Sequence, residues 1–146
     1  MSKDLGLTSQ PLSNLFPQPE SIEEWTSYCL TEDQLLEFQE KGFIHGIKVL
    51  NYDQLEVIRK ELSEIVFPEH EGREFFYEYH SNESTIPETV LFHALGAWRV
   101  RKAFHDILWN PAFVMPAYQL LGNSFRFFHD QIFCKPAHHG SVVSWH

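Results

Sequence analysis

The chain has 146 residues, 43% of them hydrophobic and 15% aromatic, and its 11 basic against 20 acidic residues give a formal net charge of −9. The aromatic content argues against disorder and predicts one domain with a buried core. The acidic balance disfavours nucleic acid and anionic membrane surfaces as partners, because both require a basic surface, although it is compatible with a local basic pocket.

The cysteines and the distribution of apolar residues bear on the compartment. Cys29 and Cys134 lie in dissimilar contexts and form no C-x-x-C pair, and no signal peptide is visible. We therefore expect free thiols in a reducing compartment and a cytoplasmic location. No apolar run approaches the ~20 residues that span a bilayer, so we expect no membrane partner.

The N-terminal part divides into a leader and a first helix. Residues 1–29 are rich in Ser, Gln, Pro and acidic residues, and their prolines predict an extended leader. Thr31 is a good N-cap, and Gln34 stands at the capping-box position three residues later. Gly42 is placed to end the helix that begins there.

A strand and a second helix are predicted next. The β-branched residues of 43–50 favour a strand, and Asn51 can cap an amphipathic helix over about 52–66. Alternating aromatic residues in 73–80 suggest another strand.

Two further helices are predicted downstream. The first covers about 97–108 and carries a basic cluster that either meets an anionic substrate or forms a solvated face, namely Arg99, Arg101 and Lys102. The second has proline at its first position, after Asn110, and ends at Gly122. Pro116 lies inside it and should kink or split it.

The segment 124–135 reads as a strand whose side chains alternate between two faces. One face carries three polar residues, His129, Gln131 and Lys135, together with Phe125, Phe127 and Phe133. Buried polar groups need partners, and a pocket for an anionic, chelating co-substrate would supply them. In the alternative interpretation, Lys135 is a strand-end lysine that extends to solvent.

The order of the C-terminal motifs is informative. The aromatic strand ends at Lys135-Pro136, a short loop follows, and the sequence ends on Trp145-His146. Near the other end, Leu-Thr-Glu-Asp-Gln at 30–34 is followed by Gly-Phe-Ile at 42–44. In this order the segments resemble the phytanoyl-CoA dioxygenase family of iron(II)/2-oxoglutarate oxygenases, in which Lys-Pro leads through a loop to a Trp-His-x-Asp metal motif.

The resemblance implies an α+β fold in which N-terminal helices pack on the first strands of a double-stranded β-helix, a jelly-roll or cupin-like fold that is incomplete in this chain. Residues 30–146 would form the N-terminal portion of this single domain. The implied activity is iron(II)- and 2-oxoglutarate-dependent hydroxylation of a small-molecule substrate. Lys135 and Gln131 would steady the co-substrate, and His129 would line the pocket.

His146 matches the first metal ligand of the family. The carboxylate, the second histidine and a co-substrate arginine have no counterpart, because the sequence ends. A site for iron needs two His and one carboxylate, so we expect neither iron nor 2-oxoglutarate to bind tightly to this chain. The spacing of the other histidines fits no metal motif, and we expect ordinary core or surface residues at His45, His70, His80, His93, His105, His138 and His139.

Three functions are therefore open. The first is an oxygenase truncated inside its metal motif, and we expect this chain alone to be inactive. The truncation favours the second, a non-catalytic isoform or fragment that acts as an interaction or regulatory domain. The third is a metal-free, cupin-like ligand-binding protein. The residue two positions after His146 would separate hydroxylases, which carry a carboxylate there, from halogenases, which carry Ala or Gly. The sequence names neither the primary substrate nor the oligomeric state.

Overall fold

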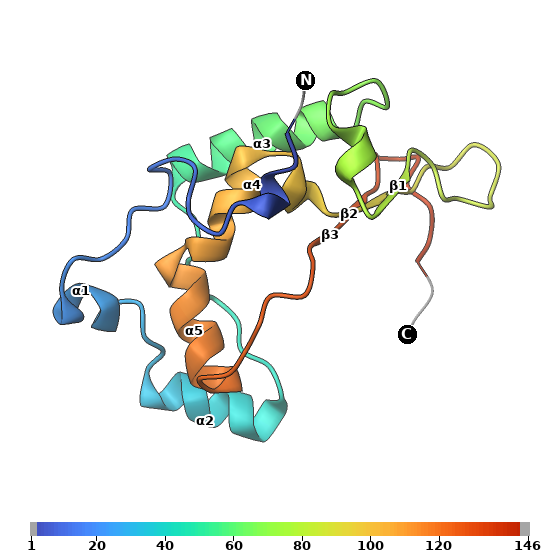
Figure 1. Cartoon of the computed structure of the whole chain (residues 1–146). Helices are drawn as coiled ribbons and strands as arrows, with labels where there is room; N and C mark the ends of the chain where they lie inside the picture. Colours follow the sequence, from blue (N-terminus) through green and yellow to red (C-terminus); the bar gives the residue numbers. More distant parts are fainter. Residues whose placement is uncertain (1–2, 144–146) are drawn as a thin grey trace.

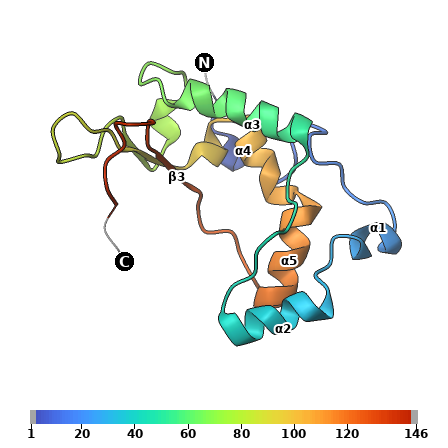
Figure 2. The ribbon, with the colours of Figure 1, turned by 180° about the vertical axis from the view of Figure 1, so that it is seen from behind.

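The computed structural model describes residues 3–143. Within them, five α-helices and a three-stranded antiparallel sheet make an α+β fold. The sheet lies beyond one end of α3, while α1 and α2 lie far from it, near α5 (Figures 1 and 2). None of the helices in this range combines the length and apolarity that crossing a bilayer requires.

The helices α2 (Glu32–Lys41) and α3 (Tyr52–Ile65) confirm the predictions from their N-caps. Thr31 and Asn51 each accept a hydrogen bond from the backbone of the third helical residue, whose Gln side chain bonds back to the cap. α2 ends at a glycine with φ of 76°, a conformation that glycine adopts without strain. Local capping chemistry is sufficient to define both helices. α1 (Ile22–Thr26) is a short turn of helix within the leader.

The helix predicted over 97–108 is broken into three pieces. A 3₁₀ turn (Ala97–Arg99) precedes α4 (Lys102–Asp106), and a second 3₁₀ turn (Ile107–Trp109) follows it. α5 (Pro111–Leu121) begins with proline after its Asn110 cap, as predicted. It continues through Pro116 without being split.

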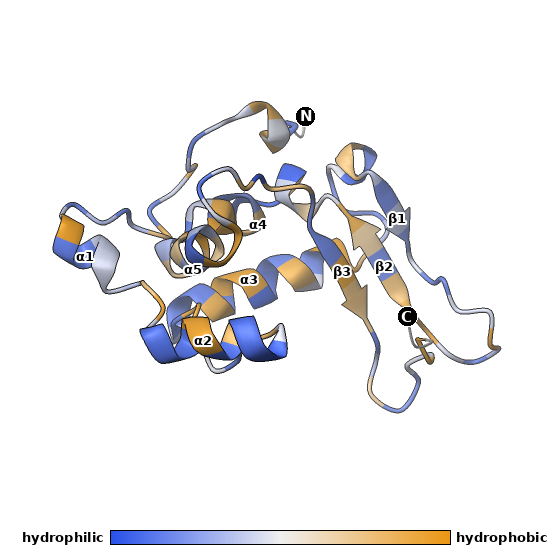
Figure 3. Ribbon diagram, turned by 90° about the horizontal axis from the view of Figure 1, so that it is seen from below, coloured by the Kyte–Doolittle hydropathy of each residue, from blue (hydrophilic) through white to orange (hydrophobic). Residues whose placement is uncertain are grey.

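The sheet has the order β1 (Glu78–His80), β2 (Phe92–Leu95) and β3 (Gln131–Cys134). Its register places His93 opposite His80 on one side and opposite Phe133 on the other. β2, which the sequence did not suggest, is therefore the central strand (Figure 3).

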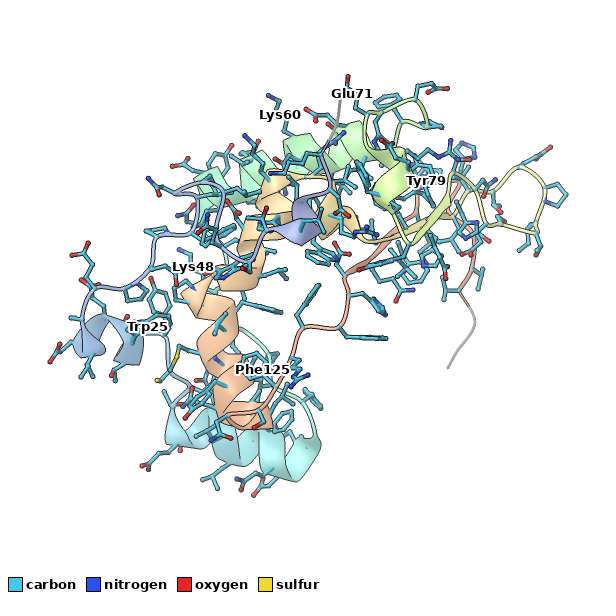
Figure 4. The ribbon with its side chains drawn as sticks, viewed as in Figure 1. Trp25, Lys48, Lys60, Glu71, Tyr79 and Phe125 are labelled. Carbon is cyan, nitrogen blue, oxygen red and sulfur yellow. The ribbon has the colours of Figure 1, made fainter. Side chains whose placement is uncertain are left out.

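One face of the sheet packs on the helices. Phe92 and Ala94 of β2 form a buried core with Ile65 at the end of α3, and Phe104 of α4 packs against this core. Tyr79 lies between the sheet and the end of α3, where its hydroxyl donates to the carbonyl of Ile65 at 2.8 Å (Figure 4). Because side chains alternate along a strand, the other face presents the polar residues discussed below.

Two strand predictions need correction. Residues 43–50 have no regular structure and no strand partner, and Gly46 has a φ of 76°, so their β-branched pattern does not produce a strand. The strand predicted over 124–135 is confined to β3, and 125–130 run outside regular structure. In both segments a suitable residue pattern lacks the neighbouring strand that would complete its hydrogen bonds. In the segment 73–80, only the last three residues form a strand, β1.

The leader is fixed to the helices at several points. Asp4 forms an ion pair with Arg99, and the fully buried Asp106 accepts hydrogen bonds from the backbone N–H of Leu12 (2.8 Å) and the hydroxyl of Ser13 (2.6 Å). Arg101 pairs with Glu64 of α3. The two arginines of the basic cluster are therefore paired with acidic residues of the leader and of α3.

Candidate functional site

The uncovered face of the sheet carries the candidate site. Alternation from the register places on it Glu78 and His80 of β1, His93 of β2, and Gln131 and Phe133 of β3. His93 is only 7% exposed, whereas its neighbours on both edge strands are exposed. The face thus has a buried imidazole at its centre and accessible polar groups around it.

Both ring nitrogens of His93 have partners. Nδ1 lies 3.1 and 3.2 Å from the two carboxylate oxygens of Glu83, and Nε2 lies 2.9 Å from the amide nitrogen of Gln131. A carboxylate only accepts, so Nδ1 carries the proton and Nε2 accepts from the amide. The ring also stacks on Phe133, with centroids 4.5 Å apart and planes at 5°, and on His80, with centroids 5.8 Å apart. These contacts fix the orientation of the imidazole.

The turn between β1 and β2 positions Glu83. Its backbone N–H donates to the carbonyl of Leu91 at 2.8 Å. The side-chain oxygen of Asn82 accepts from the N–H groups of Ser84 and Leu91. The carboxylate of Glu83 is therefore presented to His93 by a hydrogen-bonded turn, although the side chain itself is partly exposed.

Glu78, His80 and His93 form a candidate metal cluster. One ligand atom from each lies within 4.8 Å of the others. His80 Nε2 is 3.7 Å from a carboxylate oxygen of Glu78 and 3.8 Å from Oε1 of Glu83. Two histidines and a carboxylate are a donor set suited to divalent transition metals.

The residues predicted to form the site lie in different places. Gln131 lies on the candidate site, beside His93. Lys135 is exposed and follows the last residue of β3. His129 precedes β3, and its Nδ1 lies 3.2 Å from the carbonyl of Asp130. His146 lies outside the described residues.

Asp130 secures the start of β3 against the end of β2. Its carboxylate accepts hydrogen bonds from the backbone N–H groups of Gly96 (2.8 Å) and Trp98 (2.9 Å). Burial raises the pKa of this carboxyl above its ordinary value, although the backbone hydrogen bonds oppose the shift. Gly96 has φ of 102°, and a Cβ there would lie 3.1 Å from the ring of Tyr77. This corner of the sheet is therefore tightly specified.

The loop after β3 packs against the end of that strand. A Cβ at Gly140 would lie 2.7 Å from the Cβ of Lys135, so only glycine permits this approach. The loop also pairs with the segment before β2, where Val90 donates to the carbonyl of His139 at 2.7 Å and accepts from Ser141 at 3.0 Å. The backbone around Lys135 is thereby held beside the sheet.

Sequence reasoning missed Glu78, His80, Glu83 and His93. It treated the two histidines as ordinary because they are 13 positions apart and fit no metal-binding spacing. Their proximity depends on the pairing of β1 with β2, and β2 was not predicted. The sequence contained one signal for this strand: in Phe92-His93-Ala94 a polar residue stands between two apolar residues that belong to the core. Such alternation is typical of a strand with one buried face.

No protein-family model matches this sequence, and no curated protein matches it.

Proposed function

We propose that this chain is part of an iron(II)- and 2-oxoglutarate-dependent oxygenase that acts on a small molecule, and that the uncovered face of its sheet is an inner wall of a jelly roll. The observation that carries the proposal is the polar centre of this face, where Gln131 meets the buried His93. Gln131 is one of the two residues, with Lys135, that the family resemblance assigns to the co-substrate.

The form of the sheet supports this proposal. Jelly rolls pack two antiparallel sheets face to face, about 10 Å apart, with their ligands between them. Here the helices cover one face only, and Phe133 on the other face is 50% exposed. β1 and β3 are edge strands within the described residues, so each can accept a further strand.

The residues on and near this face suit a dicarboxylate. Lys135 has no ion-pair partner among residues 3–143, and its ammonium group can pair with a carboxylate. The amide of Gln131 can donate to a carboxylate or carbonyl oxygen. Phe133 would exclude water from this face, and His129 would shape the entrance. Phe125 lies near the end of α5, away from the sheet (Figure 4), so the predicted grouping of Phe125 and Phe127 with Phe133 does not form a part of this wall. His146 would be a metal ligand.

When bound, iron(II) would activate molecular oxygen together with 2-oxoglutarate: one oxygen atom enters an unactivated C–H bond of the substrate as a hydroxyl group, and the other enters succinate as 2-oxoglutarate loses CO2. The protein's contribution on this face is to orient the dicarboxylate through Lys135 and Gln131. A site that held it in one pose would also favour one substrate position, since geometry limits which C–H bond is within reach.

Binding of 2-oxoglutarate to a longer form of the protein that contains the whole metal motif, measured by calorimetry in the presence of iron(II) without oxygen, tests the proposal. Lys135→Ala should weaken binding by about 10- to 100-fold, the loss of one charge-assisted hydrogen bond. Lys60→Ala is the matched control, because Lys60 projects from α3 away from the sheet (Figure 4). Iron-dependent release of succinate is the second readout. Absence of 2-oxoglutarate binding, or equal effects of the two substitutions, would refute the proposal.

A second candidate, an interaction domain, is supported by an apolar groove of about 360 Å³ between α2, the segment 44–49 and α5. Phe113 on its border is 49% exposed and Leu121 is 68% exposed. A second copy of the chain is the simplest occupant to test. Sedimentation analysis should then show a dimer that Phe113→Glu dissociates, and a monomer at all concentrations would exclude self-association.

A further inference from the structure

We propose that Glu78, His80, Glu83 and His93 form a binding site for a divalent transition metal such as Zn²⁺. None of these four residues is assigned to the proposed iron site, whose ligand in this chain would be His146. It also goes beyond the proposed oxygenase function, because it requires neither 2-oxoglutarate nor any residue after β3.

Pairing of the strands brings the ligands together. His80 and His93 are direct partners in the β1–β2 register, and Glu78 lies on the same face, two residues from His80. The cluster atoms of Glu78, His80 and His93 lie within 4.8 Å of one another. Ligand atoms around a tetrahedral zinc at 2.0–2.1 Å are separated by about 3.3 Å. The His80 and His93 rings are stacked at 12°, and a metal lies in the plane of each imidazole that binds it, so the exposed ring of His80 must turn out of this stack to close the difference.

Glu83 completes the donor set. Its Oε1 lies between the two imidazoles, 3.2 Å from His93 Nδ1 and 3.8 Å from His80 Nε2. Among residues 3–143, the ion-pair partners of Glu78 and Glu83 are these histidines alone. With neutral imidazoles, the cluster therefore has two negative charges and no cationic side chain in contact. A divalent cation would neutralise both charges.

The buried histidine is already positioned as a ligand. Nδ1 of His93 faces Glu83, and a metal there would replace the proton that now lies between them. Gln131 contacts Nε2 at 2.9 Å, and its amide oxygen can accept from Nε2–H once the metal occupies Nδ1. A hydrogen bond to the second ring nitrogen commonly orients a metal-binding histidine. The stacking of His93 on Phe133 restricts the ring further.

The chemistry of the donors indicates the class of metal. Imidazole nitrogen favours zinc, cobalt, nickel and copper over calcium or magnesium, and carboxylates are compatible with all of them. Bound metal would also link β1, β2 and the turn that carries Glu83. We therefore expect metal binding to raise the melting temperature, since it favours the folded state.

Titration of the untagged chain with Zn²⁺ by calorimetry, and with Co²⁺ by absorption spectroscopy, tests the site. We expect one metal per chain, and intense Co²⁺ bands if the coordination is tetrahedral. His80→Ala should weaken binding by at least 10-fold, and because His80 is exposed this variant should fold. Glu83→Gln should weaken it to a similar extent, and His93→Ala should abolish it.

Two control substitutions separate this site from non-specific binding. Glu88→Gln alters an exposed carboxylate in the same turn, and His139→Ala alters a histidine in the loop after β3. Neither should change the affinity for Zn²⁺. Absence of one-to-one binding, or unchanged affinity in His80→Ala and Glu83→Gln, would overturn the proposal. Such a result would leave the oxygenase proposal standing, because 2-oxoglutarate binding and its dependence on Lys135 are measured separately.

Discussion

Asp106 provides the sharpest test of how the leader is attached. Its side chain is fully buried on α4 and accepts hydrogen bonds from the N–H of Leu12, the hydroxyl of Ser13 and Nδ1 of His105, the last at 3.0 Å. His105 Nε2 in turn lies 3.1 Å from the carbonyl of Thr8. Both ring nitrogens therefore face oxygen acceptors. The hydrogen bonds of Leu12 and Ser13 to Asp106, and the contact of His105 with Thr8, thus join the leader to α4.

Asp106→Ala leaves three donors without their acceptor. A buried donor that loses its partner costs about 1–3 kcal/mol, and hydrogen bonds to a charged acceptor such as this carboxylate are stronger than those between neutral groups. Water can reach part of the leader after the change, so we expect the free energy of unfolding to fall by about 3–5 kcal/mol. Asp106→Asn retains one acceptor oxygen, and the expected loss is about 1.5–3 kcal/mol.

The dependence of stability on acid pH should also reflect the carboxylate of Asp106. Burial favours the neutral form of Asp106, but hydrogen bonds from Ser13, His105 and Leu12 outweigh it and hold its pKa below the ordinary value of 3.8. A lowered folded-state pKa means that the ionised carboxylate stabilises the protein above about pH 4, and that this contribution is lost as the pH falls through the lowered pKa. Asp106→Asn should remove that part of the pH dependence.

Urea unfolding followed by tryptophan fluorescence measures these differences, and limited proteolysis reports whether the leader is released. Asp33→Asn is the control, because Asp33 is an exposed acid in the first turn of α2, and its change should cost about 0.3–1 kcal/mol. If Asp106→Ala were destabilised no more than this control, the buried carboxylate would not anchor the leader, and the reasoning would be refuted.

Three further predictions concern the caps and the corner of the sheet. Asn51→Ala removes the capping box of α3 and should lower the free energy of unfolding in urea by about 1 kcal/mol. Gly96→Ala places a Cβ against Tyr77 at a φ of 102°, so the melting temperature should fall by several degrees, equivalent to about 1–3 kcal/mol. Burial raises the pKa of Asp130, so its contribution to stability is greatest at low pH and declines as the pH rises through that pKa. Asp130→Asn should remove this dependence, which urea titrations between pH 3 and 7 would measure.

Local signals predicted the helices better than the strands. The caps at Thr31, Asn51 and Asn110 act within a few residues, so the sequence alone contains the interactions that start α2, α3 and α5. A strand requires a partner that is distant in sequence. Residues 43–50 have the composition of a strand but no partner, whereas β2 is only four residues long and is defined by two partners.

The candidate site shows the same division. Alternation correctly placed Gln131 and Phe133 on one face and Ile132 and Cys134 on the other, where they pack against the core. The prediction applied the same alternation to residues before Gln131, and there it is wrong, because the segment before β3 is not a strand. The proximity of His80 to His93 depends on the β1–β2 register, which no single segment specifies.

The register that builds the core also builds the candidate site. Phe92 and Ala94 are buried against the helices, so His93 between them must face the opposite side. A shift of one residue would bury the imidazole among Ile65 and Phe76 and expose the phenyl ring of Phe92. Apolar burial therefore fixes the position of His93 without any contribution from the polar face. The identities of Glu78, His80 and Glu83 are not required by the core, and binding of a cation is a function that would account for them.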